Sequence, residues 1–236
     1  MDTIGDTIRS LSSQTYSNVE HIVVDGCSTD GTLEVVRKIG KEKVVLISEK
    51  DNGIYDALNK GIKIATGEII GFLHSDDYYA HERVLQLVAD RFSDVSVNAV
   101  YGDLEYISQK NSDTVVRRWL SGKYDRNKVR NGWMPPHPTF YMRRQIYKHL
   151  GGFDTSYRIA ADYESILRYL WKHSLVVEYI PEVMIKMRMG GTSNQSLRNI
   201  LLKTKEDMRA IKGNNLPLFR AILGKNISKL SQFFLK

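Results

Sequence analysis

The chain has 236 residues and a formal net charge of +7, with 42% hydrophobic and 26% charged residues. This composition is ordinary for a globular protein and excludes a mostly disordered chain. Its single cysteine, Cys27, excludes an intramolecular disulfide, and no Cys/His cluster has zinc-site spacing. No apolar run approaches the length of about 20 residues that a membrane span needs. Residues 1–6 lack the basic and apolar regions of a signal peptide, so we expect a cytoplasmic protein.

The positive charge is concentrated at one end of the chain. Residues 186–236 carry 11 Lys and Arg against two acidic residues, whereas residues 1–185 carry 23 basic and 25 acidic residues. A basic tail of this kind binds nucleic acid, anionic lipid or a phosphorylated ligand, or is simply solvated. The basic character therefore belongs to the tail and not to the body of the protein.

Helical and strand patterns alternate over the first 92 residues. The spacing of apolar residues predicts helices over 4–11, 32–39, 54–65 and 84–92, and strands over 20–25, 44–47 and 68–73. Asp30 stands in the position of an N-cap for the second helix. Strands separated by helices of this length form β-α-β units, so the sequence predicts an α/β fold with a largely parallel sheet.

The alternation stops near residue 97. Two longer strands, over 100–107 and 114–119, follow each other without a helix, and a loop over 121–138 contains three of the five prolines. A helix over 162–173, two short strands within 175–188 and two helices beyond residue 191 complete the predicted elements. We divide the chain into a domain over 1–190 and a basic amphipathic helical tail over 191–236.

Carboxylates follow three of the predicted strands. Asp25 ends the first strand, Asp51 follows the second, and Asp76 and Asp77 follow the third. Ligands bind beyond the carboxyl ends of parallel strands, and a carboxylate pair there suits a divalent cation such as Mg²⁺ or Mn²⁺. Spacing alone leaves other interpretations open, because Asp76 and Asp77 equally suit a helix N-cap with a solvated neighbour, and Asp25 suits a turn.

Several segments together resemble family 2 glycosyltransferases of the GT-A fold, in particular bacterial enzymes of exopolysaccharide and colanic-acid type. The resemblance covers roughly residues 5–195 in the family's order. It implies a Rossmann-like mixed sheet flanked by helices. The segments are Val23–Thr32, Ser48–Gly61, Thr66–Asp77, His137–Thr139, Gly151–Asp154, Ala161–Glu164 and Met187–Ser193.

The resemblance implies roles for the matched positions. Asp25 binds the base of a nucleotide-sugar, usually uracil, and the segment from Asp51 to Asn59 lines the donor pocket. Asp76, with Ser75 beside it, contacts the donor, and Asp76 and Asp77 together hold the Mg²⁺ or Mn²⁺ ion that grips the diphosphate. These roles are carried over from the family and do not follow from spacing.

Asp162 matches the family's catalytic base, which deprotonates the acceptor hydroxyl. A positioned carboxylate makes an alcohol a better nucleophile by taking its proton in the transition state. The family implies inversion at the anomeric carbon. Asp162 also suits an N-cap of the following helix, Glu164 suits the start of that helix, and His137 suits either a buried core or a substrate site.

Three features depart from the family's pattern. The family opens with an apolar central strand, whereas this sequence starts with the helix that follows it, so we expect a start that lies too far downstream. His74 stands where the metal motif often has its first Asp. Arg188 and Met189 stand where many relatives carry a metal-binding His. The second and third departures weaken the expectation of a tightly held metal without nucleotide.

The tail over 216–236 has apolar residues at helical spacing with Lys and Arg among them. Such a helix lies on an anionic membrane surface or packs on the catalytic domain with a solvated basic face. Nucleic acid is not an expected partner, because the basic residues are confined to the tail and the sheet rim is acidic.

The sequence thus predicts an inverting glycosyltransferase that moves a sugar from a nucleotide-diphosphate sugar, UDP-linked, to a hydroxyl of a glycan or lipid-linked acceptor in bacterial surface polysaccharide synthesis. We expect the protein in the cytoplasm, either free or bound peripherally to the inner face of the cell membrane. The alternatives are a sugar-nucleotidyltransferase, for which no Gly-rich basic phosphate loop is visible, and a truncated, catalytically impaired relative that acts as a binding subunit of a polysaccharide assembly complex.

Overall fold

The computed structural model describes residues 2–190 and 196–230. The predicted motif residues Gly191, Thr192 and Ser193, and the tail residues Phe233, Phe234 and Lys236, lie outside the described residues. Over residues 2–70 the described elements alternate between helix and strand, as the apolar spacing predicted, whereas the short strand over 78–79 was not predicted. They are α1 (Asp2–Ser12), β1 (His21–Asp25), α2 (Thr32–Gly40), β2 (Val44–Ser48), α3 (Ile54–Ile64), β3 (Ile69–Ile70), β4 (Tyr78–Tyr79), α4 (Val84–Phe92), β5 (Ala99–Ile107), β6 (Val115–Trp119), α5 (Arg126–Arg130), β7 (Tyr141–Arg143), α6 (Arg144–Leu150), α7 (Ala161–Leu167), β8 (Val177–Arg188), α8 (Leu197–Gly213) and α9 (Leu218–Leu230).

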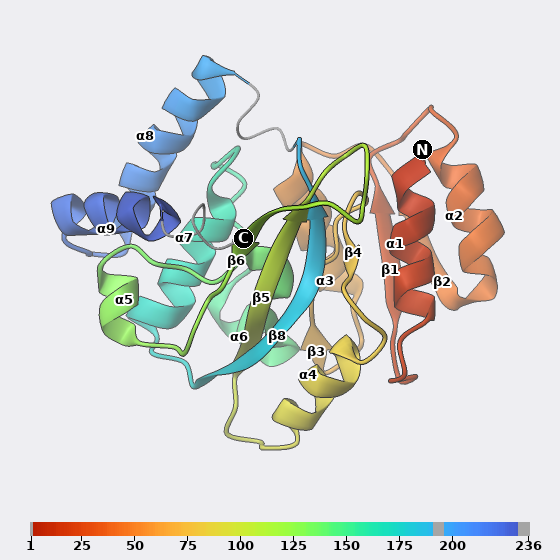
Figure 1. The fold of residues 1–236 in the computed structure, drawn as a ribbon, viewed down its shortest axis with the longest axis horizontal. Coiled ribbons are helices and arrows are strands. Elements are labelled where there is room, and N and C mark those ends of the chain that lie inside the picture. Colours follow the sequence, from red (N-terminus) through yellow and green to blue (C-terminus); the bar gives the residue numbers. More distant parts are fainter. Residues whose placement is uncertain (1, 191–195, 231–236) are drawn as a thin grey trace.

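The central sheet has six strands in the order β3-β7-β5-β8-β4, with β6 paired to β5. β5 and β8 run parallel, and the other pairs in this sheet are antiparallel. Helices cover this mixed sheet, and the C-terminal helices α8 and α9 lie on the opposite side of β5 and β8 from α1 and α2 (Figure 1). The architecture confirms the predicted α/β, Rossmann-like mixed sheet flanked by helices. The expectation of a largely parallel sheet was wrong, because among the described strands of this sheet only β5 and β8 pair in parallel, and the parallel pair β1–β2 forms a separate sheet.

Three local predictions were wrong. The two short strands expected within 175–188 are one strand, β8, because Pro181 lies where the β5–β8 register shifts and so interrupts no regular ladder. The strand expected over 68–73 pairs only at Ile69 and Ile70. Asp30 is not the N-cap of α2, because Gly31 holds that position and Asp30 accepts instead from the amide of Thr32.

A second sheet stands apart from the first. β1 and β2 form a parallel pair, and within the described chain β1 has no other strand partner and β3 pairs only with β7. The Glu20 carboxylate accepts from the amides of Thr66 at 2.8 Å and Gly67 at 3.3 Å. These bonds connect the residue before β1 with the segment that leads into β3. The two strands have therefore not closed up into one sheet, and each presents an unpaired edge to the space between them.

The tail shares the large core. Ala210 and Ile211 of α8 and Leu216 and Ala221 near α9 are buried in the same apolar cluster as α7. The Lys225 ammonium pairs with Asp207 at 2.7 Å and so links α9 to α8. Among residues 2–190 and 196–230, none of the helices combines the length and apolar character needed to cross a bilayer.

Candidate active site

A cavity of about 1650 Å³ opens between the β1 edge, the turn after β3, the start of α7 and the tail helices. Its walls include three of the predicted site residues, Ser75, Asp76 and Asp162, and also His74 and His137. Asp76 and Asp162 come from segments about 85 residues apart in the chain, so the fold has brought the predicted donor side and the predicted base to one space.

Asp25 occupies the carboxyl end of β1, as predicted. One carboxylate oxygen accepts from the Ser28 amide at 3.0 Å and from the Ser48 hydroxyl at 2.7 Å. Burial opposes ionisation of Asp25, but the hydrogen bonds outweigh it and lower the pKa of this carboxyl. Asp25 is therefore an anion whose orientation is fixed by Ser28 and Ser48.

Asp51 lies against the turn that follows Asp25. A Cβ on Gly26 would stand 2.5 Å from the Asp51 carboxylate, so only glycine fits there without a shift. Asp51 also accepts from the Gly53 amide at 2.9 Å, which fixes its orientation. The turn that follows β1 and the segment that follows β2 thus lie against each other, with Asp51 beside the residue that follows Asp25.

Asn59 is committed to the protein's own backbone. Its amide nitrogen donates to the Phe153 carbonyl and its oxygen accepts from the Phe153 amide, both at 2.8 Å. This pair of bonds joins α3 to the loop before α7. Asn59 therefore anchors α3, whose Tyr55 and Leu58 line the cavity, rather than presenting a free amide.

The turn after β3 carries the predicted metal pair. The Asp77 amide donates to the His74 carbonyl, and the Thr7 hydroxyl of α1 lies 2.7 Å from the Asp77 carbonyl and 3.1 Å from the Ser75 carbonyl. This turn is separated from α4, which begins at Val84, so the alternative interpretation of Asp76 and Asp77 as a helix N-cap is wrong. Thr7 escaped the sequence analysis because its contact spans about 70 residues.

Asp77 is completely buried, and neither of its carboxylate oxygens has a hydrogen-bond partner. Burial, with the Asp76 charge adding to it, raises the pKa of Asp77 to about 8. Within the described chain no three His, Cys, Asp or Glu side chains converge on a cation site. Two adjacent carboxylates that need a compensating charge fit Mg²⁺ or Mn²⁺, ions that commonly take one or two protein carboxylates and complete their coordination with substrate phosphates.

Arg188 connects this turn to the first helix. Its guanidinium donates to the Asp76 carbonyl at 2.8 Å and to the Asp6 carboxylate at 2.6 Å. The Arg188 side chain therefore brings a positive charge next to the Asp76–Asp77 pair. Arg188 stands where the family resemblance implies a metal-binding histidine.

Asp162 is the second residue of α7 and faces the cavity. One of its carboxylate oxygens accepts from the Tyr163 amide at 2.8 Å and lies 3.3 Å from the Tyr55 hydroxyl. Ala160 holds the N-cap position, so Asp162 is not the cap that its spacing also suggested. Asp162 lines the cavity, which is where a base has to meet an acceptor hydroxyl.

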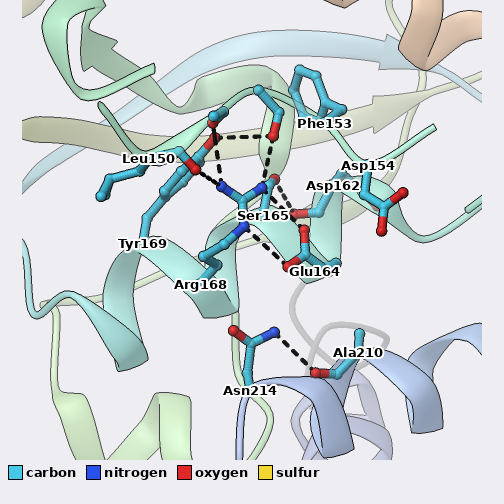
Figure 2. Close-up of polar contacts among 12 residues, drawn as sticks. Leu150, Phe153, Asp154, Asp162, Glu164, Ser165, Arg168, Tyr169, Ala210 and Asn214 are labelled. Atoms are coloured by element: carbon cyan, nitrogen blue, oxygen red, sulfur yellow. Dashed lines mark hydrogen bonds and ion pairs between the residues drawn. The ribbon is translucent and has the colours of Figure 1, made fainter. Parts of the chain in front are cut away.

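Glu164 is not available for the same role. Arg168 binds its carboxylate through two bonds of 3.0 and 3.1 Å. Figure 2 shows the Arg168 guanidinium joined both to Glu164 and to the loop around Leu150. This ion pair ties α7 to that loop and leaves Asp162 as the carboxylate of α7 that faces the cavity.

Two histidines stand beside Asp162. His137 stacks on Phe72 with ring centroids 5.4 Å apart and meets Phe153 edge-on at 5.3 Å. Burial lowers the pKa of His137 to about 4 and also lowers that of His74, so both rings are neutral near pH 7. Neutral imidazoles offer one donor and one acceptor each, which suits polar recognition without added charge.

Comparison with known proteins agrees with this architecture. A model of glycosyl transferase family 2 matches residues 1–159, and the chain belongs to this family. A PGL/p-HBAD biosynthesis glycosyltransferase of Mycobacterium bovis is 29% identical over 202 residues, covering 82% of this chain and 75% of the relative. A glycosyltransferase of Haemophilus influenzae is 26% identical over 245 residues, covering 97% of this chain and 73% of the relative. The protein is a glycosyltransferase enzyme.

Solved structures show the same fold. S. aureus TarS 1-349 in complex with UDP-GlcNAc aligns with a TM-score of 0.69 at 17% identity, covering 100% of this chain and 70% of that one. The mannosyltransferase PcManGT from Pyrobaculum calidifontis, in complex with GDP-Man and Mn²⁺, aligns with a TM-score of 0.66 at 19% identity, covering 98% and 67%. In a longer TarS structure this chain spans 40% of the length. At these identities the likeness establishes the GT-A fold.

Proposed function

We propose that this enzyme transfers a sugar, with inversion, from a UDP-sugar to a hydroxyl of a glycan or lipid-linked acceptor in bacterial surface polysaccharide synthesis. The observation that supports this most is the cavity that Asp76 and Asp162 share. A donor whose diphosphate lies at Asp76 and Asp77 presents its sugar toward the start of α7.

Each described residue then has a task. Asp25 holds the base and Asp51 the wall of the donor pocket, while Asn59 fixes that wall through Phe153. Asp162 accepts the proton of the acceptor hydroxyl as the oxygen attacks the anomeric carbon, and the bond from that carbon to the diphosphate breaks on the opposite face. Mg²⁺ or Mn²⁺ bound at Asp76 and Asp77 supplies positive charge to the departing diphosphate.

The test is donor turnover. Purified enzyme is incubated with UDP-GlcNAc or UDP-glucose and Mn²⁺, and released UDP is measured with and without chelator. We expect slow, metal-dependent UDP release even without acceptor, because water can replace the acceptor hydroxyl. No release from any of a panel of UDP- and GDP-sugars, by folded protein, would contradict the proposal.

One observation favours a second candidate, a binding subunit with impaired catalysis. The β1–β2 pair that carries Asp25 is not joined to the central sheet by any strand pairing among the described residues. A binding subunit retains UDP affinity but releases no UDP from a sugar donor, so the same assay separates the two candidates.

A membrane-bound acceptor is supported by the outer face of α9. Phe219, Leu223 and Ile227 project at one-turn spacing and are 82%, 50% and 56% exposed, and Arg220 lies beside them. An apolar stripe beside basic residues suits an anionic membrane interface. Co-flotation with vesicles containing anionic lipid, lost in Phe219→Ser and absent with neutral vesicles, tests this part of the proposal on its own.

A further inference from the structure

The segment that leads into α7 is held by a side chain from the tail. The backbone amides of Arg158, Ile159 and Ala160 all donate to the Glu206 carboxylate of α8, at 2.8, 2.9 and 2.9 Å. Glu206 is 6% exposed, so these bonds are shielded from water. Three successive amides directed at one buried carboxylate form a charge-assisted cluster, stronger than bonds between neutral groups.

This cluster fixes the backbone that leads directly into α7. Ala160 is the N-cap residue of α7 and has no side chain that can accept a hydrogen bond. Of the three amides that Glu206 binds, one belongs to this N-cap residue, and the amides of Arg158 and Ile159 come just before it. Glu206 lies about 45 residues further along the chain, and Asp162 lies only two residues beyond the last amide that it binds.

The same segment is held from its other side. The Tyr55 hydroxyl of α3 donates to the Ile159 carbonyl at 2.6 Å and lies 3.3 Å from the Asp162 carboxylate. The peptide groups on both faces of Ile159 are thus fixed, one by α8 and one by α3. A segment held in this way leaves the first turn of α7, and the direction of the Asp162 side chain, little freedom.

We propose that Glu206 is a positioning residue for the transfer reaction: through residues 158–160 it sets the place of the Asp162 carboxylate in the cavity. This inference rests on the proposed function, in which Asp162 is the base. It makes α8, which lies beyond the residues that the family model matches, a part of the catalytic apparatus rather than an appendage.

The variant Glu206→Gln tests the proposal. Glutamine keeps the length of the side chain but has one acceptor oxygen, and its NH₂ group faces an amide donor, so at least one of the three amides loses its partner. Because small displacements of a catalytic group are costly, we expect kcat for sugar transfer or donor hydrolysis to fall by about tenfold or more. The KM for the donor and the Kd for UDP should stay within about twofold, since positioning acts on the chemical step.

A matched control is Glu105→Gln. Glu105 is also buried, at 7% exposure, and its carboxylate binds Arg118 between β5 and β6, away from α7. It should keep kcat near the wild-type value. Melting temperatures of both variants show how much of any effect comes from stability.

Four results would overturn the inference. One is an unchanged kcat in Glu206→Gln, and another is a loss of kcat matched by an equal loss of UDP affinity, which a purely structural role produces. If Glu206→Gln does not fold, Glu206→Asp retains both oxygens on a shorter side chain; a smaller fall in kcat at constant KM supports positioning, and full activity contradicts it. Wild-type protein that turns over no sugar donor would overturn the proposed function and this inference together, whereas active wild type with an equally active Glu206→Gln overturns the inference alone.

Discussion

The β1–β2 pair and the central sheet, both drawn in Figure 1, differ in how many strand partners and how much burial support them. β5 is buried along almost its whole length and has strand neighbours on both sides. β1 is half-buried, and within the described chain its strand pairing is to β2 alone. The groups proposed for chemistry, Asp76, Asp77 and Asp162, stand next to the firm region, whereas Asp25, proposed for base recognition, stands on the looser one.

This contrast teaches that base recognition and chemistry rest on separate supports. A change in the central sheet or in α7 should affect catalysis, whereas a change in the β1–β2 pair should affect mainly nucleotide affinity.

Hydrogen exchange tests the division directly. Unpaired strand edges open locally, while strands inside a sheet exchange only through large openings. We expect the slowest amides of Ile22–Val24 to exchange at least about 10³-fold faster than those of Val100–Leu104, a difference that local opening energies readily cover. Equal protection of both strands, measured by mass spectrometry or NMR, would show that the two regions form one cooperative unit.

The base is tested by Asp162→Asn. Asparagine retains an oxygen that can accept from Tyr55 and the Tyr163 amide, so the fold should persist. We expect transfer to slow by at least about 10²-fold, the lower end of general-base contributions, at unchanged UDP affinity. Asp154→Asn, on the exposed surface, serves as the control. A near-normal rate would reduce Asp162 to a residue of the first helical turn.

The metal pair is tested by Asp77→Asn. The amide is nearly isosteric but uncharged, so it cannot balance a cation. We expect Mn²⁺ to strengthen UDP binding to the wild type by about tenfold or more, a free-energy gain above about 1.4 kcal/mol, and to leave the variant unaffected. Calorimetric titration with and without Mn²⁺ measures this, with Asp90→Asn as the surface control. Equal enhancement in wild type and variant would remove Asp77 from the metal site.

The raised pKa of Asp77 predicts a pH dependence of stability in the metal-free protein. A carboxyl whose pKa is about 8 when folded, far above the ordinary value, favours the folded state at low pH, and that contribution is lost as pH rises toward 8. We expect Tm to fall by several degrees between about pH 6 and pH 8.5 because one buried group accounts for a few kcal/mol. Asp77→Asn should flatten this slope, and added Mn²⁺ should reduce it; a slope that the variant retains would assign it to another group.

Local sequence patterns were sufficient to predict most of the fold and part of the candidate site. Most helices and strands up to residue 92 follow from apolar periodicity, although the two-residue strand β4 does not, and the strand ends before Asp25, Asp51 and Asp76 follow from their order. Pro181 led to the prediction of two strands where the structure has one, because a proline normally marks the end of a strand. Here the proline lies where the register between β5 and β8 shifts.

The remaining features of the candidate site depend on contacts between segments that are distant in the sequence. The bonds from Thr7 to the metal turn, from Arg188 to Asp76 and from Glu206 to residues 158–160 join elements whose local sequence holds no sign of the partner. The burial of Asp77 and the stacking of His137 on Phe72 depend on tertiary packing in the same way. Such features become visible only when the chain is folded.

The most direct test of the central claim is a crystal structure of the protein with UDP and Mn²⁺. We expect the uracil ring to contact Asp25, Mn²⁺ to lie between the diphosphate and the carboxylates of Asp76 and Asp77, and the sugar-bearing phosphate to face Asp162. A nucleotide bound elsewhere, or a diphosphate and metal that touch neither Asp76 nor Asp77, would contradict it.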